Sequence, residues 1–324
     1  MSLTFGELEA VTTDYFAAEN GKAVDIYFYT SFLMEYLMKQ KKGLYMTPDG
    51  GDYIRVPLEY DGQEGGFYAR GDTVSSDDRE SVNAARFAWR HAYGNASIYR
   101  IDTLKNSGLE QEIDLVEQRL AGAQKTVAKV IAESTFDDAG AGSTRWGGLR
   151  ACCNETSATA YGDIAEDDLV AADGTKPWEG KTNSTGYVIS PNLLRTGRSA
   201  AKVRDGKFGK PDLVITTETL WNKWADMLQA QQRFTDGKET VKAGFTGFYF
   251  DGMEVYPDDY CPSGYAFWVN SKHYGYAVHK RGNFVREKWM KIPDSPGDKS
   301  MKIYVDGNTI CNNRKAQQAY SGLS

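Results

Sequence analysis

The stretch NSGLEQEIDLVEQRLAGAQKTVAKVIAESTF, residues 106–136, decides how the rest of the chain is organised. Its apolar residues recur in steps of four and three, which keeps one stripe of a helix apolar. The stripe consists of Leu109, Ile113, Val116, Leu120, Ala123, Val127 and Val130, widened by Leu115 and Ile131. Ser107 and Glu110 have the spacing of a capping box. The pattern predicts a helix over residues 109–135, about 40 Å long at about 1.5 Å per residue.

Two packing modes fit such a helix. A coiled-coil partner helix is one of them, but the apolar repeat stops before four heptads and Gly122 interrupts it. A single helix laid across a sheet is the other. The strand-like sequence on both sides of the helix favours a helix on a sheet.

Composition sets the broad class of the protein. With 324 residues, 41% hydrophobic and 25% charged, the chain can bury a large core as one elaborate domain or two. The formal net charge of −6 disfavours a protein built to bind nucleic acid through a basic surface. Residues 24–38 form the most apolar run, which is too short to cross a bilayer, so we expect neither a membrane partner nor a signal peptide.

No constellation of residues points to catalysis. The cysteines, at 152, 153, 261 and 311, lack the C-x-x-C spacing of zinc sites, and we expect free thiols in a reducing cytoplasm. The three histidines lack metal-ligand spacing, and His91 is expected to pack on an aromatic strand face. A phosphate loop and a nucleophile elbow are both missing from the sequence. We therefore expect no catalytic residue, cofactor or metal, and an enzyme with an unfamiliar site is kept as an alternative of a different class.

Residues 53–93 predict a long two-stranded ribbon followed by an aromatic strand. Alternating Ile54, Val56 and Leu58 form one limb, and Pro57 restricts that limb to an edge strand or a lone ribbon. Residues 61–66 form a glycine-rich tip, and residues 67–70 begin the return. The aromatic strand carries Phe87, Trp89, His91 and Tyr93 on one face, and we expect the long helix to pack on its sheet through Phe87, Trp89 and the C-terminal strands.

The C-terminal half is rich in strands. Residues 211–216 predict a buried strand that leads into a helix from Thr217, and Asp251-Gly252 predicts a type I′ hairpin turn within residues 245–256. Further strands are predicted at 265–269, 274–278, 284–290, 301–305 and 309–311, the last two joined by a turn at Asp306-Gly307. Residues 137–200 indicate loops and short elements, and Ser31 is expected to cap a short helix over residues 32–40. The predicted class is α+β with mainly antiparallel sheets.

The order of these blocks resembles the major capsid protein of tailed bacteriophages, which has the Hong Kong 97-like fold. The resemblance runs from Val56-Pro-Leu-Glu-Tyr60 and Gly66-Phe-Tyr68, through Phe87-Ala-Trp89, to Asn106-Ser-Gly108 at the head of the helix. It continues with Pro211-Asp-Leu-Val-Ile-Thr-Thr217 and Leu220-Trp221, and ends with Gly307-Asn308, Cys311-Asn-Asn-Arg314 and Tyr320-Ser-Gly-Leu323. Each motif is weak alone, and the order of the motifs over most of the chain carries the resemblance.

The resemblance implies a spine helix, an extended loop and an N-terminal arm. The implied divisions are an N-arm (1–45), an extended loop (46–85), a peripheral domain with the spine (86–136), an axial domain (137–270) and a return to peripheral strands (271–324). The implied function is a non-enzymatic subunit of pentamers and hexamers in an icosahedral shell around double-stranded DNA, held without sequence-specific binding. Scaffolding, portal and decoration proteins are implied partners, and the implied location is the virion, assembled in the bacterial cytoplasm. An encapsulin-like compartment shell is the alternative.

Charge predicts where neighbouring subunits meet. Some members of the family join a lysine of the extended loop to a neighbour's asparagine, but no lysine occurs between Lys42 and Lys105. The ribbon instead has a formal charge of −5 over residues 59–78, and residues 272–291 have +5. We expect inter-subunit contacts from Glu59, Asp61, Glu64, Arg70 and Asp72 to Lys280, Arg281, Arg286 and Lys288 of a neighbour; solvation of both segments is the alternative.

Overall fold

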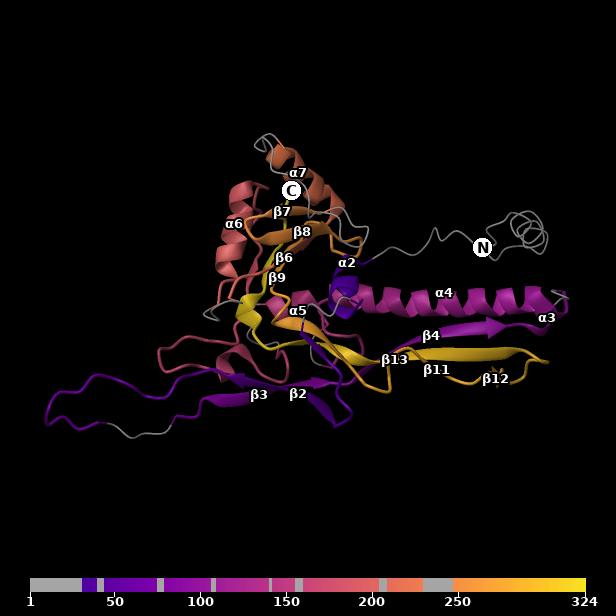
Figure 1. Cartoon of the computed structure of the whole chain (residues 1–324), viewed down its shortest axis with the longest axis horizontal. Helices are drawn as coiled ribbons and strands as arrows, with labels where there is room; N and C mark the ends of the chain where they lie inside the picture. The colour runs from indigo at the N-terminus through magenta and orange to yellow at the C-terminus, as the bar shows by residue number, and fades with distance from the viewer. Residues whose placement is uncertain are drawn as a thin grey trace.

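The computed structural model describes residues 31–39, 44–74, 79–105, 109–139, 142–154, 160–203, 209–229 and 247–324. Within them the chain is a mixed α+β protein with two six-stranded sheets and a separate two-stranded ribbon, which confirms the predicted α+β class. The molecule is elongated, with the ribbon at one end and a long helix running towards the other (Figure 1). No helix in the described part of the chain is long and apolar enough to cross a membrane.

The long helix α4 extends over Leu109–Thr135, as the sequence predicts. Ala123, Val127 and Ile131 are buried and pack in the cores beneath it, whereas Val130 is 43% exposed. The prediction that Val130 belongs to the buried stripe is therefore wrong, because the stripe is narrower than the apolar pattern suggested. The capping residue Ser107 and the side chains of Leu109, Glu110, Ile113 and Leu115 lie outside the described residues.

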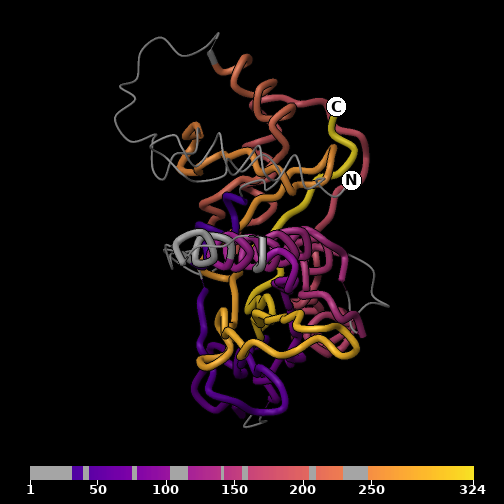
Figure 2. Tube along the Cα trace, turned by 90° about the vertical axis from the view of Figure 1, so that its right-hand side faces the viewer, coloured from indigo at the N-terminus to yellow at the C-terminus, as the bar shows by residue number. Residues whose placement is uncertain are grey.

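The first sheet carries α4 on one face, as the views from the side and along the helix show (Figures 1 and 2). Its strands are β1 (Leu44–Met46), β4 (Arg90–Ile98), β10 (Tyr274–Val278), β11 (Val285–Arg286), β12 (Met290–Lys291) and β13 (Lys299–Cys311). Among the described strands of this sheet, only β1 and β10 pair in parallel. The short helix α3 (Arg100–Lys105) follows β4. The arrangement confirms a helix laid across a sheet.

The residues of β4 that face α4 are small. Ala92 and Ala96 are buried, and a Cβ added to Gly94 would lie 2.5 Å from the carbonyl oxygen of Ala123. Tyr93 is 63% exposed on the opposite face, and His91 there bonds to Asp306 through Nδ1 and Oδ1 at 2.7 Å. The prediction that His91 is a packed residue is therefore wrong, since its side chain is 69% exposed. The close approach of α4 leaves no room for large side chains on that side.

Strand β13 runs without a turn through the dipeptide Asp306-Gly307. Asp306 pairs with His91 of β4, and Gly307 pairs with Arg90 on one side and Val278 of β10 on the other. The predicted hairpin between residues 301–305 and 309–311 is therefore wrong. Pairing on both sides holds the dipeptide extended, which overrides its local preference for a turn.

The second sheet has the strand order β5-β14-β9-β6-β8-β7. The strands are β5 (Thr182–Asn183), β6 (Leu213–Thr216), β7 (Phe248–Phe250), β8 (Met253–Pro257), β9 (Ala266–Val269) and β14 (Gln318–Tyr320). Helices α6 (Pro191–Ala200) and α7 (Glu218–Gln229) pack beside it (Figure 1). The predicted strand and helix from residue 211 are confirmed, as is the hairpin, where Asp251 and Gly252 both have positive φ.

Helix α6 lies in the region where the sequence analysis expected only loops and short elements. Ser190 caps it by accepting a hydrogen bond from the backbone N–H of Leu193 at 3.2 Å, and Pro191 occupies the first turn. This serine–proline pair is a typical signal for the N-terminus of a helix, so α6 could have been predicted from the sequence. Smaller elements in the same region are α5 (Leu149–Cys153) and η3 (Glu166–Asp168), and η5 (Arg314–Ala316) precedes β14.

The ribbon consists of β2 (Tyr53–Glu59) and β3 (Val82–Ala88). Ile54, Val56 and Leu58 are buried, which confirms the predicted alternation. The return strand begins at Val82, whereas residues 67–70 lie in the connecting segment, so the predicted position of the return is wrong. Gln63 and Arg79 bridge the two limbs of that segment through reciprocal side-chain to backbone hydrogen bonds of 3.1 and 3.4 Å.

A short helical segment holds the start of the described chain against the second sheet. It consists of α2 (Phe32–Met34) and η2 (Glu35–Lys39), and Ser31 caps it as predicted. Asp258 Oδ2 accepts hydrogen bonds from the Ser31 hydroxyl and the Leu33 backbone N–H, both at 3.0 Å. Burial raises the pKa of this Asp258 carboxyl above its usual range, and the donated hydrogen bonds partly offset that effect.

Candidate functional site

Two regions of opposite charge lie at opposite ends of the molecule. The acidic connecting segment of the ribbon, of which residues 60–74 and 79–81 are described, forms one end of the long axis, and strands β11 and β12 lie near the other end (Figure 1). A single chain cannot bring these regions together without a large rearrangement. Two copies placed head to tail can do so, and such a contact is heterologous, which produces rings when its rotation closes.

The predicted residues of the ribbon are mostly exposed, and several have contacts within their own chain. Glu59 and Arg70 are exposed and form no ion pair with any described residue. Glu64 lies 3.9 Å from the Arg79 guanidinium, and Asp72 accepts a 2.7 Å hydrogen bond from the Ala69 backbone N–H. Asp77 and Asp78, which contribute to the formal charge of the segment, lie outside the described residues.

Asp61 is the most constrained of the predicted acids. It is half-buried, and its two carboxylate oxygens accept hydrogen bonds from the backbone N–H groups of Gly62 at 2.8 Å and Ala172 at 3.0 Å. The structure therefore connects Asp61 to a distant loop of its own chain. This contact was not predictable from the sequence, because Asp61 and Ala172 are 111 residues apart.

The predicted basic residues are exposed and lie in two places: Arg286 and Lys288 belong to the β11–β12 segment, and Lys280 and Arg281 lie in the turn that follows β10. Lys280 pairs with Asp49 of its own chain at 3.1 Å, where both side chains are 64% exposed. Arg281, Arg286 and Lys288 are exposed and form no ion pair with any residue that the structure describes. Three cations of the group are thus available to a partner.

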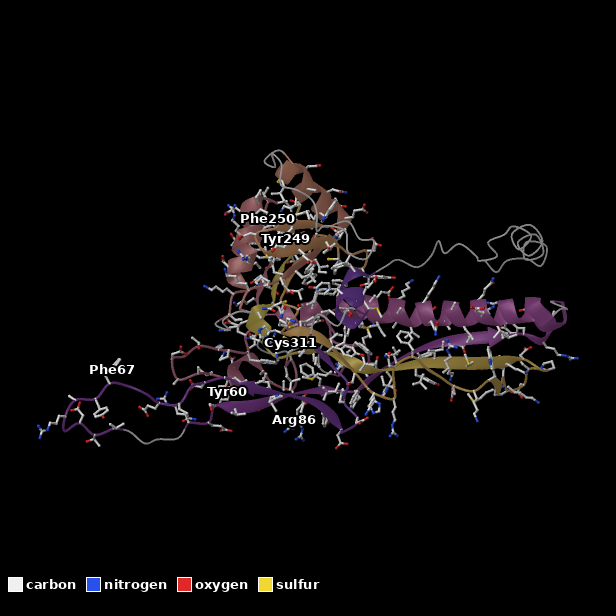
Figure 3. All side chains as sticks on the ribbon, viewed as in Figure 1. Tyr60, Phe67, Arg86, Tyr249, Phe250 and Cys311 are labelled. Atoms are coloured by element: carbon white, nitrogen blue, oxygen red, sulfur yellow. The ribbon has the colours of Figure 1, made fainter. Side chains whose placement is uncertain are left out.

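Two exposed aromatic side chains lie beside the acidic residues of the ribbon. Phe67 is fully exposed and Tyr68 is 75% exposed, and Phe67 points away from the body of the molecule (Figure 3). Both belong to residues 67–70, which were predicted to begin the return strand. The preceding Gly65-Gly66 pair is the signal that indicates a loop instead. Exposed aromatics at the end of a long projection are typical of interface anchors.

The polar side chains in the interior are arranged as expected for groups that stabilise the fold. All four cysteines are free and buried, and burial raises the pKa of the Cys261 thiol well above its usual value. His273 is buried and bonds through Nδ1 to Asn312 at 2.8 Å, whereas His91, expected to be packed, is exposed. In the described ranges no group of three or more His, Cys, Asp or Glu side chains could hold a metal ion.

Comparison with known proteins identifies the fold. No protein-family model and no curated protein matches the sequence. Solved structures do match, and over nearly the whole chain. The capsid asymmetric unit of cyanophage A-1(L) has a TM-score of 0.65 at 14% identity and covers 95% of this chain and 99% of its own. This chain has the fold of a phage capsid protein.

Two further structures extend the comparison. The capsid of cyanophage P-SCSP1u has a TM-score of 0.58 at 8% identity, covering 97% of this chain and 94% of its own. The SrpI encapsulin of Synechococcus elongatus PCC 7942 has a TM-score of 0.56 at 8% identity, with 95% of each chain covered. At these identities the likeness establishes the fold alone.

Proposed function

We propose that this chain is the major capsid protein of a tailed phage, with the Hong Kong 97-like variant of the capsid fold. The observation that carries the proposal is the pairing of a capsid fold over 95% of the chain with oppositely charged ends that one chain cannot join. A capsid subunit contributes contacts and shape to the shell, so the proposed role is structural and not enzymatic.

The proposed divisions of the chain are those expected of a Hong Kong 97-like subunit. Residues 1–45 are the N-arm, 46–85 the extended loop, 86–136 the peripheral strand and spine helix, 137–270 the axial domain, and 271–324 the return to the peripheral strands. In this assignment the spine is α4 and the extended loop is the ribbon. The last strand, β14, pairs with β9 of the second sheet, so the C-terminal division also contributes a strand to the sheet of the proposed axial domain.

The proposed assembly unit is a pentamer or hexamer in which the ribbon of one subunit lies on the β11–β12 segment of the next. Glu59, Glu64 and Asp72 face Arg281, Arg286 and Lys288 of the neighbour. Each exposed ion pair contributes only about 0–1 kcal/mol, so stability comes from many contacts repeated around a closed shell. The contacts weaken as the ionic strength rises, because salt screens exposed charges.

The test reverses two charges. Arg281→Glu combined with Arg286→Glu leaves the fold of the subunit intact, because both side chains are exposed and form no ion pair with described residues. We expect closed particles to be lost in sedimentation and electron microscopy. Lys202→Glu with Lys223→Glu is the matched control, since it reverses two exposed charges on the second-sheet half of the molecule. Normal shells from the arginine variant would contradict the proposed interface.

The proposed content of the shell is double-stranded DNA, held without sequence-specific contacts. The formal net charge of −6 suits a wall that encloses DNA without adhering to it. Scaffolding, portal and decoration proteins are proposed partners, and the virion is the proposed location after assembly in the host cytoplasm. Particles from infected cells should protect genome-length DNA from added nuclease.

An encapsulin-like shell is the second candidate, supported by the likeness to the SrpI encapsulin. It shares the proposed assembly mode and differs in what the shell contains. Protein cargo without nuclease-protected DNA in native particles would favour this candidate over the phage capsid.

A further inference from the structure

The ribbon contacts the body of the molecule at its base and again further out. At its base, where β2 and β3 connect to β1 and β4 of the first sheet, the Asn308 side-chain amide donates a 2.9 Å hydrogen bond to the Ala88 carbonyl at the end of β3. A contact so close to the base restrains the angle of the ribbon only weakly. A second attachment further out is needed to set the angle of the ribbon.

The second attachment is the segment of residues 160–180, which runs beside the ribbon in Figure 1. The Arg86 backbone N–H donates to the Gly162 carbonyl at 2.8 Å, and the ring of Phe87 meets the ring of Tyr161 edge-on, with centroids 5.3 Å apart. The Asp61 carboxylate accepts the Ala172 backbone N–H at 3.0 Å, beyond the end of β2. The segment therefore supports the ribbon like a strut, from mid-strand to just past the paired region.

This strut has little secondary structure of its own, with one turn of η3 and an isolated bridge between Tyr161 and Ile164. Arg314 contacts residues of the strut and connects them to the body of the molecule. The guanidinium donates through Nε to the Cys152 carbonyl at 2.8 Å and through its two terminal nitrogens to the carbonyls of Trp178 at 2.9 Å and Asn154 at 2.7 Å. It also lies over the ring of Tyr161 at 5.3 Å.

Glu166 completes the arrangement. It is 4% exposed, its carboxylate lies 3.4 Å from the Arg314 guanidinium, and the same oxygen accepts the Gly180 backbone N–H at 2.9 Å. Arg314 itself is 0% exposed. A buried cation is costly unless its hydrogen bonds and its charge are satisfied. The donors of a planar guanidinium point in fixed directions, so the partners must lie in a matching arrangement. The geometry of the strut is thus fixed by a residue of the C-terminal segment.

We infer that Arg314 and Asp61 are positioning residues, which act through the segment of residues 160–180 to set the direction in which the ribbon leaves the body. Asp61, which the sequence analysis assigned to a neighbouring subunit, joins the ribbon to its own chain in this inference. Arg314 joins the strut to the C-terminal segment. The consequence for shell assembly rests on the proposed function, whereas the direction of the ribbon in one chain does not.

The experiment measures the direction of the ribbon by electron spin resonance distances. Gly65→Cys at the ribbon tip and Asn222→Cys on α7 carry the spin labels; both positions are exposed, and the four native cysteines are buried. The labelled full-length chain is diluted with excess unlabelled chain, so that only distances within one chain contribute. The variants are Asp61→Ala, Glu166→Gln and Arg314→Lys. Asp61→Asn is the control, because it removes the charge and the bond to the neighbouring Gly62 N–H but keeps one oxygen for the Ala172 N–H.

We expect one narrow distance distribution for the parent chain and for Asp61→Asn. Asp61→Ala and Glu166→Gln should broaden the distribution roughly twofold. Asp61→Ala removes the acceptor of the Ala172 N–H, and Glu166→Gln leaves the buried Arg314 guanidinium without its anionic partner. Circular dichroism and thermal unfolding show whether Arg314→Lys still folds; if it does not fold, the two milder variants alone test the inference. An unchanged narrow distribution in both Asp61→Ala and Glu166→Gln, or a broad distribution in the parent chain, would overturn the inference.

Assembly assays on the same variants separate this inference from the proposed function. Broadened distances in a chain that never forms particles under any condition support the strut and contradict the capsid proposal. Normal shells with unchanged distances in all variants support the capsid proposal and contradict the strut. Loss of shells in Asp61→Asn with an unchanged distance assigns Asp61 to a charge contact with a neighbour and overturns its positioning role.

Discussion

Two long projections leave the body of this molecule in opposite directions, and they are stabilised in different ways. Helix α4 lies on β4 and β13, with Val127 and Ile131 fully buried beneath it. The ribbon has a buried face only along β2 and β3, and every described residue from 62 to 74 is exposed. One projection is stabilised within the chain, and the other ends in a segment that no described part of the chain covers.

This difference indicates that the two projections have different functions. A projection with a continuous core keeps its shape alone and can set the geometry of a subunit. A projection with a fixed base and an uncovered end gains its remaining contacts from another molecule, as expected for a loop that connects subunits. Variants that remove apolar contacts should therefore act on the folding of the subunit in the first projection and on assembly in the second.

The largest effect is expected at the helix. Ile131→Ala removes a fully buried side chain beneath α4 and should lower the free energy of unfolding by about 2–5 kcal/mol. Val130→Ala, one residue earlier on the same helix, is the matched control; its side chain is 43% exposed, and it should change the free energy of unfolding by less than about 0.5 kcal/mol. Denaturant unfolding measures both. Equal losses would show that the buried stripe extends to Val130.

A smaller effect is expected at the base of the ribbon. Val56→Ala deletes two buried carbon atoms and should cost about 1.6 kcal/mol locally, at about 0.8 kcal/mol per buried carbon. The loss should appear as faster proteolytic cleavage between residues 60 and 81, with little change in the thermal midpoint of the whole chain. Arg55→Ala, on the exposed face of the same strand, should leave the cleavage rate unchanged. A lowered global midpoint for Val56→Ala would show that the ribbon and the body unfold as one unit.

The elements that could be predicted from the sequence are those in which local pattern and tertiary environment agree. Helix α4, strand β2 and the turn at Asp251-Gly252 each have a periodicity or a turn signal that the fold also uses. Strand β13 contains an equally strong turn signal at Asp306-Gly307, yet pairing with β4 and β10 holds it extended. Local propensity is overridden where a strand is paired on both sides.

The candidate site also has a part that was predictable from the sequence and a part that was not. The acidic ribbon and the basic segment were predictable, since clustered charges are visible in a sequence. The contacts that hold the ribbon were not predictable, because Arg314 reaches the carbonyl of Cys152 across 162 residues of sequence. Backbone carbonyls and N–H groups carry most of these contacts, and they have no signature in the identity of the residues that supply them.

The smallest effect on the folding of the subunit is expected at the tip of the ribbon. Phe67 is fully exposed, so Phe67→Ser should leave the free energy of unfolding unchanged within about 0.5 kcal/mol. The same change should reduce the yield of closed particles, because exposed aromatics bury a large apolar area at interfaces. Phe67→Leu keeps an apolar side chain at this position and should retain most of the yield. Light scattering with electron microscopy measures the yield, and calorimetry measures the stability. Unimpaired assembly of Phe67→Ser would remove the tip from the interface and leave the charged residues of the ribbon as its contact.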